Sequence, residues 1–285
     1  MTRIAVAQLN PRLGDVDRNL ESVERSMKHA SSAGAQLVVF PECALTGYVF
    51  NSLTEALTVA EPIPGPTSRR IADMAQEYGI YVVVGTLERE VERCYNTAIL
   101  AGPQGLEAIY RKTHTLCLGV DRFTTPGDIP YRVHDLPIGR IGILICYDLR
   151  FPEPARVLAL GGAQLIILPT NWPESSNIQA DVFTRSRAAE NRVFVAACDR
   201  VGQERDTTFL GRSQIVGPDG RVREEASTQY EDLLVADLDL GEADVKRIVV
   251  RAGIHEMDCM ADRRPELYGD LIGPPSQVQT DAFKN

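Results

Sequence analysis

Three side chains that can carry out covalent chemistry each follow a short apolar segment of the chain. They are Cys146 after residues 141–145, Glu42 after residues 37–40 and Lys112 after residues 106–110. The segment before Cys146 is too short for a typical helix and rich in β-branched residues, which predicts a buried strand. Ligand sites in open α/β sheets lie beyond the carboxyl ends of the strands. The three side chains are therefore candidates for one site.

Cys146, Glu42 and Lys112 have complementary chemistry if they meet. A cysteine nucleophile needs a base to take its proton and an acid to protonate the leaving nitrogen, and Glu42 can do both in turn. The charge of Lys112 is expected to lower the pKa of the thiol and to stabilise the oxyanion of a tetrahedral intermediate. Together they predict acyl transfer from a C–N bond. Taken singly, each also has a structural explanation: a core cysteine, a helix-capping or solvated glutamate and a surface lysine.

The sequence offers fewer residues for other catalytic mechanisms. Of the four histidines, only His114 lies near a candidate site, two residues after Lys112, where it either orients a neighbour or has a structural role. Residues 211–215 begin like a serine nucleophile elbow but do not have its final glycine. The sequence contains no zinc-protease, phosphate-loop or dinucleotide motif, so no metal and no cofactor is expected.

Composition limits the partners and the compartment. The chain has 285 residues, 44% of them hydrophobic, and a net charge of −9, which argues against nucleic acid or an anionic membrane as a main partner. A small molecule is the expected partner. No signal peptide or membrane-spanning segment is recognised, so we expect a cytoplasmic protein. The six cysteines show no C-x-x-C spacing and are expected to be thiols.

Strand and helix patterns alternate along the chain. Predicted strands cover residues 4–9, 37–40, 80–85, 141–145, 165–168 and 193–197, with edge strands at 96–100, 106–110 and 131–133. Predicted helices begin at Asp17 as a cap, cover 68–78, begin near Pro152, and cover 177–191. This alternation is typical of α/β proteins.

The two halves of the chain share a sequence pattern. Residues 34–41 read GAQLVVFP and residues 162–169 read GAQLIILP, which indicates duplication of a β-α-β-α-β unit, although a chance match of common residues is the alternative. Two such units can pack sheet against sheet as a four-layer α-β-β-α sandwich. We expect one domain over residues 1–260 and a C-terminal tail over 261–285 that wraps a partner subunit or frays.

The chain resembles the nitrilase superfamily of carbon-nitrogen hydrolases. Three motifs occur in the order typical of that family: FPE with LTGY at residues 40–48, YRKTH at 110–114 and CYDLRFPE at 146–153. The resemblance implies an α-β-β-α sandwich in which Glu42 is the general base, Lys112 stabilises the oxyanion and Cys146 forms a thioester. It also implies self-association into dimers or larger assemblies.

One expected residue differs, and four residues are candidates for the substrate pocket. Family members often carry a second glutamate between the lysine and the cysteine, whereas this chain has Asp121, which either shares that role or pairs with Arg122. The candidate substrate-binding residues, taken from or beside the family motifs, are Tyr48, Tyr147, Asn171 and Trp172. Trp172 either packs in the core or offers an aromatic wall for an apolar or planar acyl group.

The motif around Cys146 is similar to those of amidases and carbamoyl hydrolases, whereas true nitrilases tend to have Trp-Glu after the cysteine. We therefore expect hydrolysis of a small carboxamide, releasing ammonia and a carboxylic acid. The alternatives are an N-carbamoyl compound, a nitrile, acyl transfer to an amine, and a catalytically idle scaffold or binding protein. No arginine could be assigned to a substrate carboxylate, which favours a simple aliphatic amide.

Overall fold

The structure is a computed structural model, and it describes residues 1–273. The chain divides into two compact units, a first over Met1–Val245 and a second that begins at Lys246. The first unit contains both large sheets and every candidate site residue. Residues 274–285, including the end of the predicted tail, lie outside the described residues.

Two six-stranded sheets form the centre of the first unit. The first sheet has the order β14-β1-β2-β3-β4-β5, and the second β13-β12-β9-β8-β7-β6. The strands of the first sheet are β1 Thr2–Gln8, β2 Leu37–Val39, β3 Tyr81–Glu90, β4 Arg93–Gly102, β5 Gly105–Arg111 and β14 Asp232–Leu238. Those of the second are β6 Val133–Leu136, β7 Gly139–Ile143, β8 Leu165–Pro169, β9 Phe194–Cys198, β12 Gln214–Val216 and β13 Val222–Glu225. A small hairpin joins β10 Gln203–Glu204 to β11 Thr207–Thr208.

The predicted repeat of the two halves is confirmed in the strand pairing. In the first half β1, β2 and β3 run parallel, with Val6 beside Val39 and Val39 beside Val83. In the second half β7, β8 and β9 run parallel in the same order. Parallel strands need crossover connections, and helices supply them in both halves. The carboxyl ends of each parallel trio therefore lie at one edge of its sheet.

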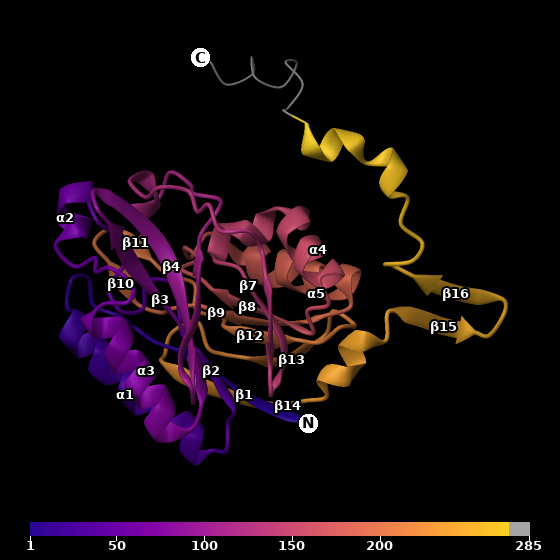
Figure 1. The fold of residues 1–285 in the computed structure, drawn as a ribbon, viewed down its shortest axis with the longest axis horizontal. Helices are drawn as coiled ribbons and strands as arrows, with labels where there is room; N and C mark the ends of the chain where they lie inside the picture. Colours follow the sequence, from indigo (N-terminus) through magenta and orange to yellow (C-terminus); the bar gives the residue numbers. More distant parts are fainter. Residues whose placement is uncertain (274–285) are drawn as a thin grey trace. The chain divides into compact units, whose positions relative to one another are not determined.

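Helices cover the outer face of each sheet. They are α1 Val16–Ser32, α2 Leu53–Leu57, α3 Pro66–Tyr78, α4 Pro152–Leu160 and α5 Thr184–Asn191. Figure 1 shows α1 and α3 on one side of the paired sheets and α4 and α5 on the other. This is the predicted four-layer α-β-β-α sandwich. Where the sheets face each other, the Cys198 thiol of β9 lies 3.2 Å from the carbonyl oxygen of Ala7 in β1.

Burial of one apolar face holds each helix on its sheet. Val23 and Met27 of α1 and Met74 of α3 belong to one buried cluster with Val38 and Val82 of the sheet. Each fully buried side chain of this size stabilises the fold by roughly 1.5–3 kcal/mol. The helical spacing of apolar residues was therefore a sound guide to which face packs inward.

The helix ends agree with the predicted start and stop residues, except at the cap of α1. The cap of α1 is Asp15, whose side chain accepts a hydrogen bond from Arg18 N, and not Asp17, which lies inside the first turn. Pro66 and Pro152 begin α3 and α4, where a missing N–H costs nothing. Gly79 ends α3 with a φ of 64°, a left-handed conformation that glycine adopts without strain.

Three other predicted elements differ from the structure. The strand before Cys146 ends at Ile143, and Cys146–Arg150 form a short 3-10 helix, η2. The edge strand expected at 131–133 is instead β6, which starts at Val133. The helix expected over 177–191 is present over these residues, but it contains a π-helical turn, η3 Gln179–Phe183, before α5. Further 3-10 turns are η1 Gly119–Arg122 and η4 Leu240–Asp244.

The second unit contains a hairpin of β15 Arg247–Arg251 and β16 His255–Asp258, followed by the 3-10 turns η5 Pro265–Leu267 and η6 Gly269–Ile272. Many of its apolar side chains are exposed: Val250 by 63%, Ile254 by 68% and Leu271 by 64%. Within residues 1–273, no helix combines the length and the apolar character needed to cross a membrane.

Candidate active site

Glu42 lies in a tight turn directly after β2. Gly85 N of β3 donates to the Pro41 carbonyl oxygen at 3.2 Å, which holds the turn against the neighbouring strand. A Cβ atom on Gly85 would lie 2.4 Å from Cys43 N, so the turn can approach β3 this closely only because residue 85 is glycine. Cys43 takes a left-handed φ of 48°, which is strained for a residue other than glycine and is typical of functional sites. The turn thus fixes the Glu42 side chain, which is fully buried.

Lys112 and Asp121 join Glu42 in a buried ionic cluster. Lys112 follows β5, and its Nζ lies 2.7 Å from Glu42 Oε1 and 2.5 Å from Asp121 Oδ2. All three side chains are inaccessible to solvent. Removing one partner of a buried ion pair leaves an uncompensated charge, so each group depends on the others. The structure therefore brings together Glu42, Lys112 and Asp121 as the sequence predicts.

Asp121 pairs with Lys112 and not with its neighbour in sequence. Arg122 donates to the carbonyl oxygens of Gly119 and Phe50, at 3.0 and 2.9 Å. Asp121 instead accepts from Lys112, from the Tyr48 hydroxyl at 3.2 Å and from Asn96 at 3.0 Å. The alternative of an Asp121–Arg122 pair is wrong.

Asn96, in the middle of β4, is a site residue that the sequence did not reveal. Its Nδ2 donates to Glu42 Oε1 at 2.6 Å and to Asp121 Oδ1 at 3.0 Å, so it joins the two carboxylates. Its Oδ1 lies 3.6 Å from the Cys43 thiol. An amide in an otherwise apolar buried strand was the available signal, because such a group needs polar partners.

Cys146 lies at the start of η2, with a left-handed φ of 45°. Asp148 holds this turn: it accepts from Ile145 N at 3.0 Å, from the Tyr110 hydroxyl at 2.7 Å and from His114, whose Nδ1 lies 2.7 Å away. Tyr110 and His114 flank Lys112 in sequence. Asp148 therefore ties the nucleophile turn to the segment that carries the lysine.

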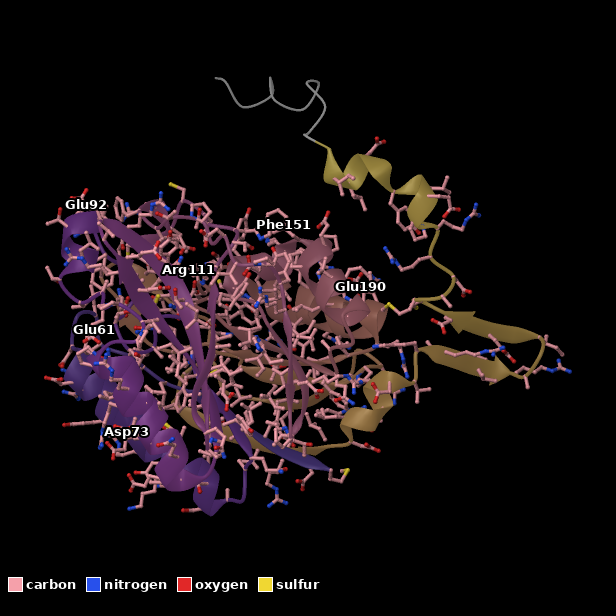
Figure 2. All side chains as sticks on the ribbon, in the orientation of Figure 1. Glu61, Asp73, Glu92, Arg111, Phe151 and Glu190 are labelled. Carbon is pink, nitrogen blue, oxygen red and sulfur yellow. The ribbon has the colours of Figure 1, made fainter. Side chains whose placement is uncertain are left out.

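The contacts of His114 agree with both interpretations of the sequence, an orienting role and a structural one. Besides its contact with Asp148, its ring stacks on Phe151, with centroids 3.9 Å apart; Figure 2 labels Phe151, the residue just before α4. Arg187 of α5 also contacts this turn, donating to the carbonyl oxygens of Leu149 and Arg150, both at 3.0 Å. These residues hold the shape of the turn.

The protonation of the cluster follows from its burial. Burial raises the pKa of the Glu42 carboxyl, Lys112 opposes that effect, and Asp121 adds to it. Burial also raises the pKa of the Cys146 thiol well above its ordinary value, with Glu42 adding and Lys112 opposing. For Lys112, burial favours the neutral amine, but Asp121 and Glu42 outweigh it and raise its pKa. The expected lowering of the thiol pKa by Lys112 is thus present but outweighed, and the resting thiol is neutral and needs a base.

The two oxygens of the Glu42 carboxylate have different surroundings. Its Oε1 is shared by Lys112 and Asn96, whereas Oε2 has no hydrogen-bond partner among residues 1–273. The same carboxyl group affects the pKa of the Cys146 thiol. One oxygen is therefore held by two donors, and the other has no protein partner in the described part of the chain.

A pocket of about 90 Å³ opens beside Cys146. Its lining comprises Tyr48, Leu116, Leu118, Cys146, Tyr147, Arg150, Asn171, Trp172, Pro173, Ser176 and Gln179. All four predicted substrate-binding residues are thus in the wall. The pocket is smaller than the ~150 Å³ cavity known to hold benzene, so it suits a small acyl group.

Tyr48 also supports the ionic cluster beneath the pocket. Its hydroxyl donates to Asp121 Oδ2 at 3.2 Å, and a Cβ on Gly119 would lie 2.4 Å from its ring. Tyr147 is held edge-on to Phe151, with centroids 5.3 Å apart.

The loop after β8 supplies the wall opposite the ionic cluster. Trp172 N donates to Asp199 Oδ1 at 2.9 Å, and Leu210 N donates to the Trp172 carbonyl oxygen at 2.8 Å. The Thr170 hydroxyl and the Asn171 N–H lower the pKa of the Cys146 thiol, against the larger effect of burial. Asp199 is fully buried, and burial raises its pKa well above the ordinary value. Neither Asp199 nor Gln179 was singled out from the sequence.

No group of three or more His, Cys, Asp or Glu side chains within residues 1–273 is arranged to hold a metal ion. Arg111, next to Lys112, forms a separate ion pair with Glu88 at 2.6 Å, and Figure 2 labels it on the first sheet. All six cysteines are free thiols.

Comparison with known proteins agrees with this geometry. The sequence profile of the family described as carbon-nitrogen hydrolase matches residues 3–247. The chain belongs to the carbon-nitrogen hydrolase family. It is 40% identical to a nitrilase from Pyrococcus abyssi, covering 94% of this chain and 99% of that protein. It is 34% identical to an (R)-stereoselective amidase from Pseudomonas sp, covering 96% and 95%.

Solved structures show the same fold. An amidase from Nesterenkonia sp. AN1, in a variant with acrylamide added to its active site cysteine, superposes with a TM-score of 0.80 at 28% identity. The match covers 95% of the hydrolase and all of that chain. The predicted membership of the nitrilase superfamily and the α/β sandwich are both confirmed.

Proposed function

We propose that the hydrolase cleaves the C–N bond of a small carboxamide through a thioester on Cys146. The observation that carries the proposal is the Glu42 carboxylate, which is fixed through Oε1 by Lys112 and Asn96 and keeps Oε2 unpaired among the described residues. The charge of Glu42 also raises the pKa of the Cys146 thiol. The similarity to amidases supports the choice of substrate bond.

The first half of the reaction forms the thioester. Glu42 takes the thiol proton, and Cys146 sulfur attacks the carbonyl carbon, forming a C–S bond and an oxyanion. The Lys112 ammonium, held in its charged form by two carboxylates, stabilises that oxyanion. Glu42 then gives its proton to nitrogen as the C–N bond breaks, and ammonia leaves.

The second half of the reaction releases the acid. Glu42 takes a proton from a water molecule, and the hydroxide attacks the thioester carbon. When the C–S bond breaks, the carboxylic acid leaves and Glu42 returns the proton to sulfur. Asp121 keeps Lys112 charged throughout, so its role is to position the lysine and set the electrostatics of the cluster.

A substrate panel scored for ammonia release tests this function. The panel contains simple carboxamides such as butyramide, N-carbamoyl amino acids and nitriles, with added amines as competing acyl acceptors. We expect the highest kcat/KM for a carboxamide and product formation with water. Preference for N-carbamoyl compounds or nitriles, or acyl transfer to the amine in place of hydrolysis, would replace the proposal by that alternative. No turnover of any compound would favour an idle scaffold.

We also propose that the hydrolase self-associates as a homodimer or larger homo-oligomer and acts in the cytoplasm. Val250, Ile254 and Leu271 of the second unit are more than half exposed, and burying such apolar side chains in an interface would be favourable. Sedimentation equilibrium measures the assembly directly. A monomer at micromolar concentration would contradict it.

A further inference from the structure

Three side chains in the pocket beside Cys146 carry buried polar atoms without partners. Asn171, Trp172 and Gln179 are only 1%, 1% and 5% exposed. Asn171 Nδ2 and Oδ1, Trp172 Nε1 and Gln179 Oε1 find no hydrogen-bond partner within residues 1–273. Leaving a buried polar group unpaired costs roughly 1–3 kcal/mol, so such groups are rare in native proteins. All four atoms belong to residues that line one pocket, so a molecule bound there is an available partner for them.

Two separate elements deliver these side chains to the pocket. Asn171 and Trp172 lie on the loop after β8, which Asp199 and Leu210 hold in place. Gln179 begins the π-helical turn η3, where the Thr184 hydroxyl donates to the Gln179 carbonyl oxygen at 2.9 Å. Single π-helical turns inside helices are uncommon and occur frequently at functional sites. The convergence of these two elements on one pocket is therefore a specific feature of this fold.

The unpaired atoms define the chemistry of their ligand. Asn171 Nδ2 and Trp172 Nε1 are donors, whereas Asn171 Oδ1 and Gln179 Oε1 are acceptors. An alkyl group would leave all of them unpaired, and a carboxylate, which only accepts, would leave the acceptors unpaired. A hydroxyl or a carboxamide can both donate and accept. The matching substituent is therefore neutral and polar.

The charge around the pocket agrees with a neutral substituent. Arg150 is the one charged side chain among the described residues that line the pocket. It is exposed, and its guanidinium lies 5.1 Å from the Phe183 ring centroid, which provides a contact for the cation within the protein. A buried cation aimed at a substrate carboxylate is thus missing from the described wall.

Building on the proposed amide hydrolysis, we propose that Asn171, Trp172 and Gln179 form a polar subsite for the acyl chain. This subsite selects small carboxamides whose acyl chain ends in a neutral group that both donates and accepts a hydrogen bond, such as a hydroxyl or a second carboxamide. This proposal differs from the expectation of a simple aliphatic amide, and a comparison of substrates decides between the two.

Two matched pairs of substrates test the subsite in the wild-type enzyme. Butyramide and 3-hydroxypropanamide differ only by a terminal methyl or hydroxyl, and malonamide and malonamate differ by a carboxamide or carboxylate. We expect kcat/KM to be about tenfold or more higher for 3-hydroxypropanamide than for butyramide, because a site built to bond a hydroxyl discriminates against its absence. Malonamide should likewise exceed malonamate. Equal or greater kcat/KM for butyramide, or a preference for malonamate, would overturn the proposal.

Variants locate the discrimination in the named residues. Gln179→Met and Trp172→Phe keep most of the side-chain volume and remove the acceptor or the donor, so the ratio of kcat/KM for 3-hydroxypropanamide over butyramide should fall several-fold. Gln76→Met, at an exposed glutamine of α3, is the matched control and should leave the ratio unchanged. A ratio that survives both pocket variants would contradict the assignment even if the wild type prefers the hydroxyl.

Binding measured by calorimetry to Cys146→Ala separates the subsite from the chemistry. If the wild type releases ammonia from none of the four amides, the proposed function fails, yet tighter binding of 3-hydroxypropanamide than of butyramide would still support the subsite. If the amides are hydrolysed with no preference and bind equally, the subsite alone fails.

Discussion

The two halves of the sandwich repeat one fold but contribute different groups to the site. The first half and the connection after it supply Glu42, Asn96, Lys112 and Asp121, which bond to one another. The second half supplies Cys146 and the loop after β8, where Asn171 and Trp172 keep unpaired polar atoms among the described residues. Apart from Glu42 Oε2, the ionic cluster is bonded within the protein, whereas in the proposed subsite the substrate would pair the polar atoms of Asn171 and Trp172.

This difference separates two tasks of one site. Preorganised charges cost no reorganisation when the oxyanion forms, which favours a fixed proton-transfer cluster. Unpaired donors and acceptors make affinity depend on the substrate, which favours discrimination. Substitutions in the ionic cluster of the first half should therefore alter the rate of the chemical step and the stability of the fold. Substitutions in the second half should remove the nucleophile or alter the preference between substrates.

The largest expected effect is at the nucleophile. Cys146→Ala should lower kcat by roughly 10⁴-fold or more, because no other group can form the thioester. Thermal unfolding followed by circular dichroism should show an intact fold. Cys117→Ala removes an exposed thiol outside the ionic cluster and serves as the matched control, with an unchanged rate expected. Wild-type turnover by the Cys146→Ala enzyme would show that the second half does not supply the nucleophile.

Breaking the charged cluster comes next. Lys112→Met leaves Glu42 and Asp121 buried without their cation, so the free energy of unfolding should fall by about 3–5 kcal/mol. Urea unfolding measures this change. The double variant Lys112→Met with Asp121→Asn removes one of the two unpaired charges and should regain part of the loss. If Lys112→Met unfolded at the wild-type urea concentration, the cluster would not be the interdependent unit described above.

Asp121→Asn keeps the shape of the cluster and removes one charge. Since Asp121 raises the pKa of Glu42, its removal should shift the acid limb of the pH profile of kcat/KM to lower pH. In the wild type that limb should lie above 4.5, the ordinary value, because burial raises the pKa of Glu42 and only its ionised form accepts the thiol proton. Losing a charged hydrogen bond should also lower kcat/KM by about 10- to 100-fold. An unchanged rate and profile would mean that Asp121 does not act on Glu42 or Lys112.

The smallest effect is expected at Tyr48, which lines the pocket and also contacts the ionic cluster. Tyr48→Phe removes one hydrogen bond to Asp121 and leaves the pocket wall in place, so kcat/KM should fall only several-fold, corresponding to about 0.5–1.5 kcal/mol. Tyr95→Phe, at another buried tyrosine whose hydroxyl contacts Glu90, is the control. Equal effects of the two variants would show that Tyr48 has no special link to the cluster.

Sequence patterns could predict the residues at strand ends because topology alone brings those ends together. Cys146, Glu42 and Lys112 each follow a segment that the sequence predicts as a strand, and the repeated GAQL motif indicates a duplicated β-α-β-α-β unit. The turn at Cys146 was less readable, since the apolar run continues two residues beyond the end of β7. A run of buried residues does not reveal where backbone pairing stops.

Residues whose role depends on register or on irregular turns could not be predicted. Asn96 reaches Glu42 because Thr86 pairs with Thr97 and sets which side chains of β4 face the turn. Gln179 reaches the pocket through a π-helical turn that the helical pattern over 177–191 does not distinguish from an α-helix. Such features depend on tertiary contacts rather than on local residue preferences.

The central claim is that the two halves meet in a thioester on Cys146. Mass spectrometry of the wild-type enzyme quenched during turnover of a slowly hydrolysed amide tests it most directly. We predict an intact mass increased by that of the acyl group, and a peptide carrying the adduct on Cys146, which disappears after alkaline hydroxylamine. An adduct on any other residue, or steady turnover with no acyl adduct trapped under conditions where deacylation limits the rate, would contradict the account.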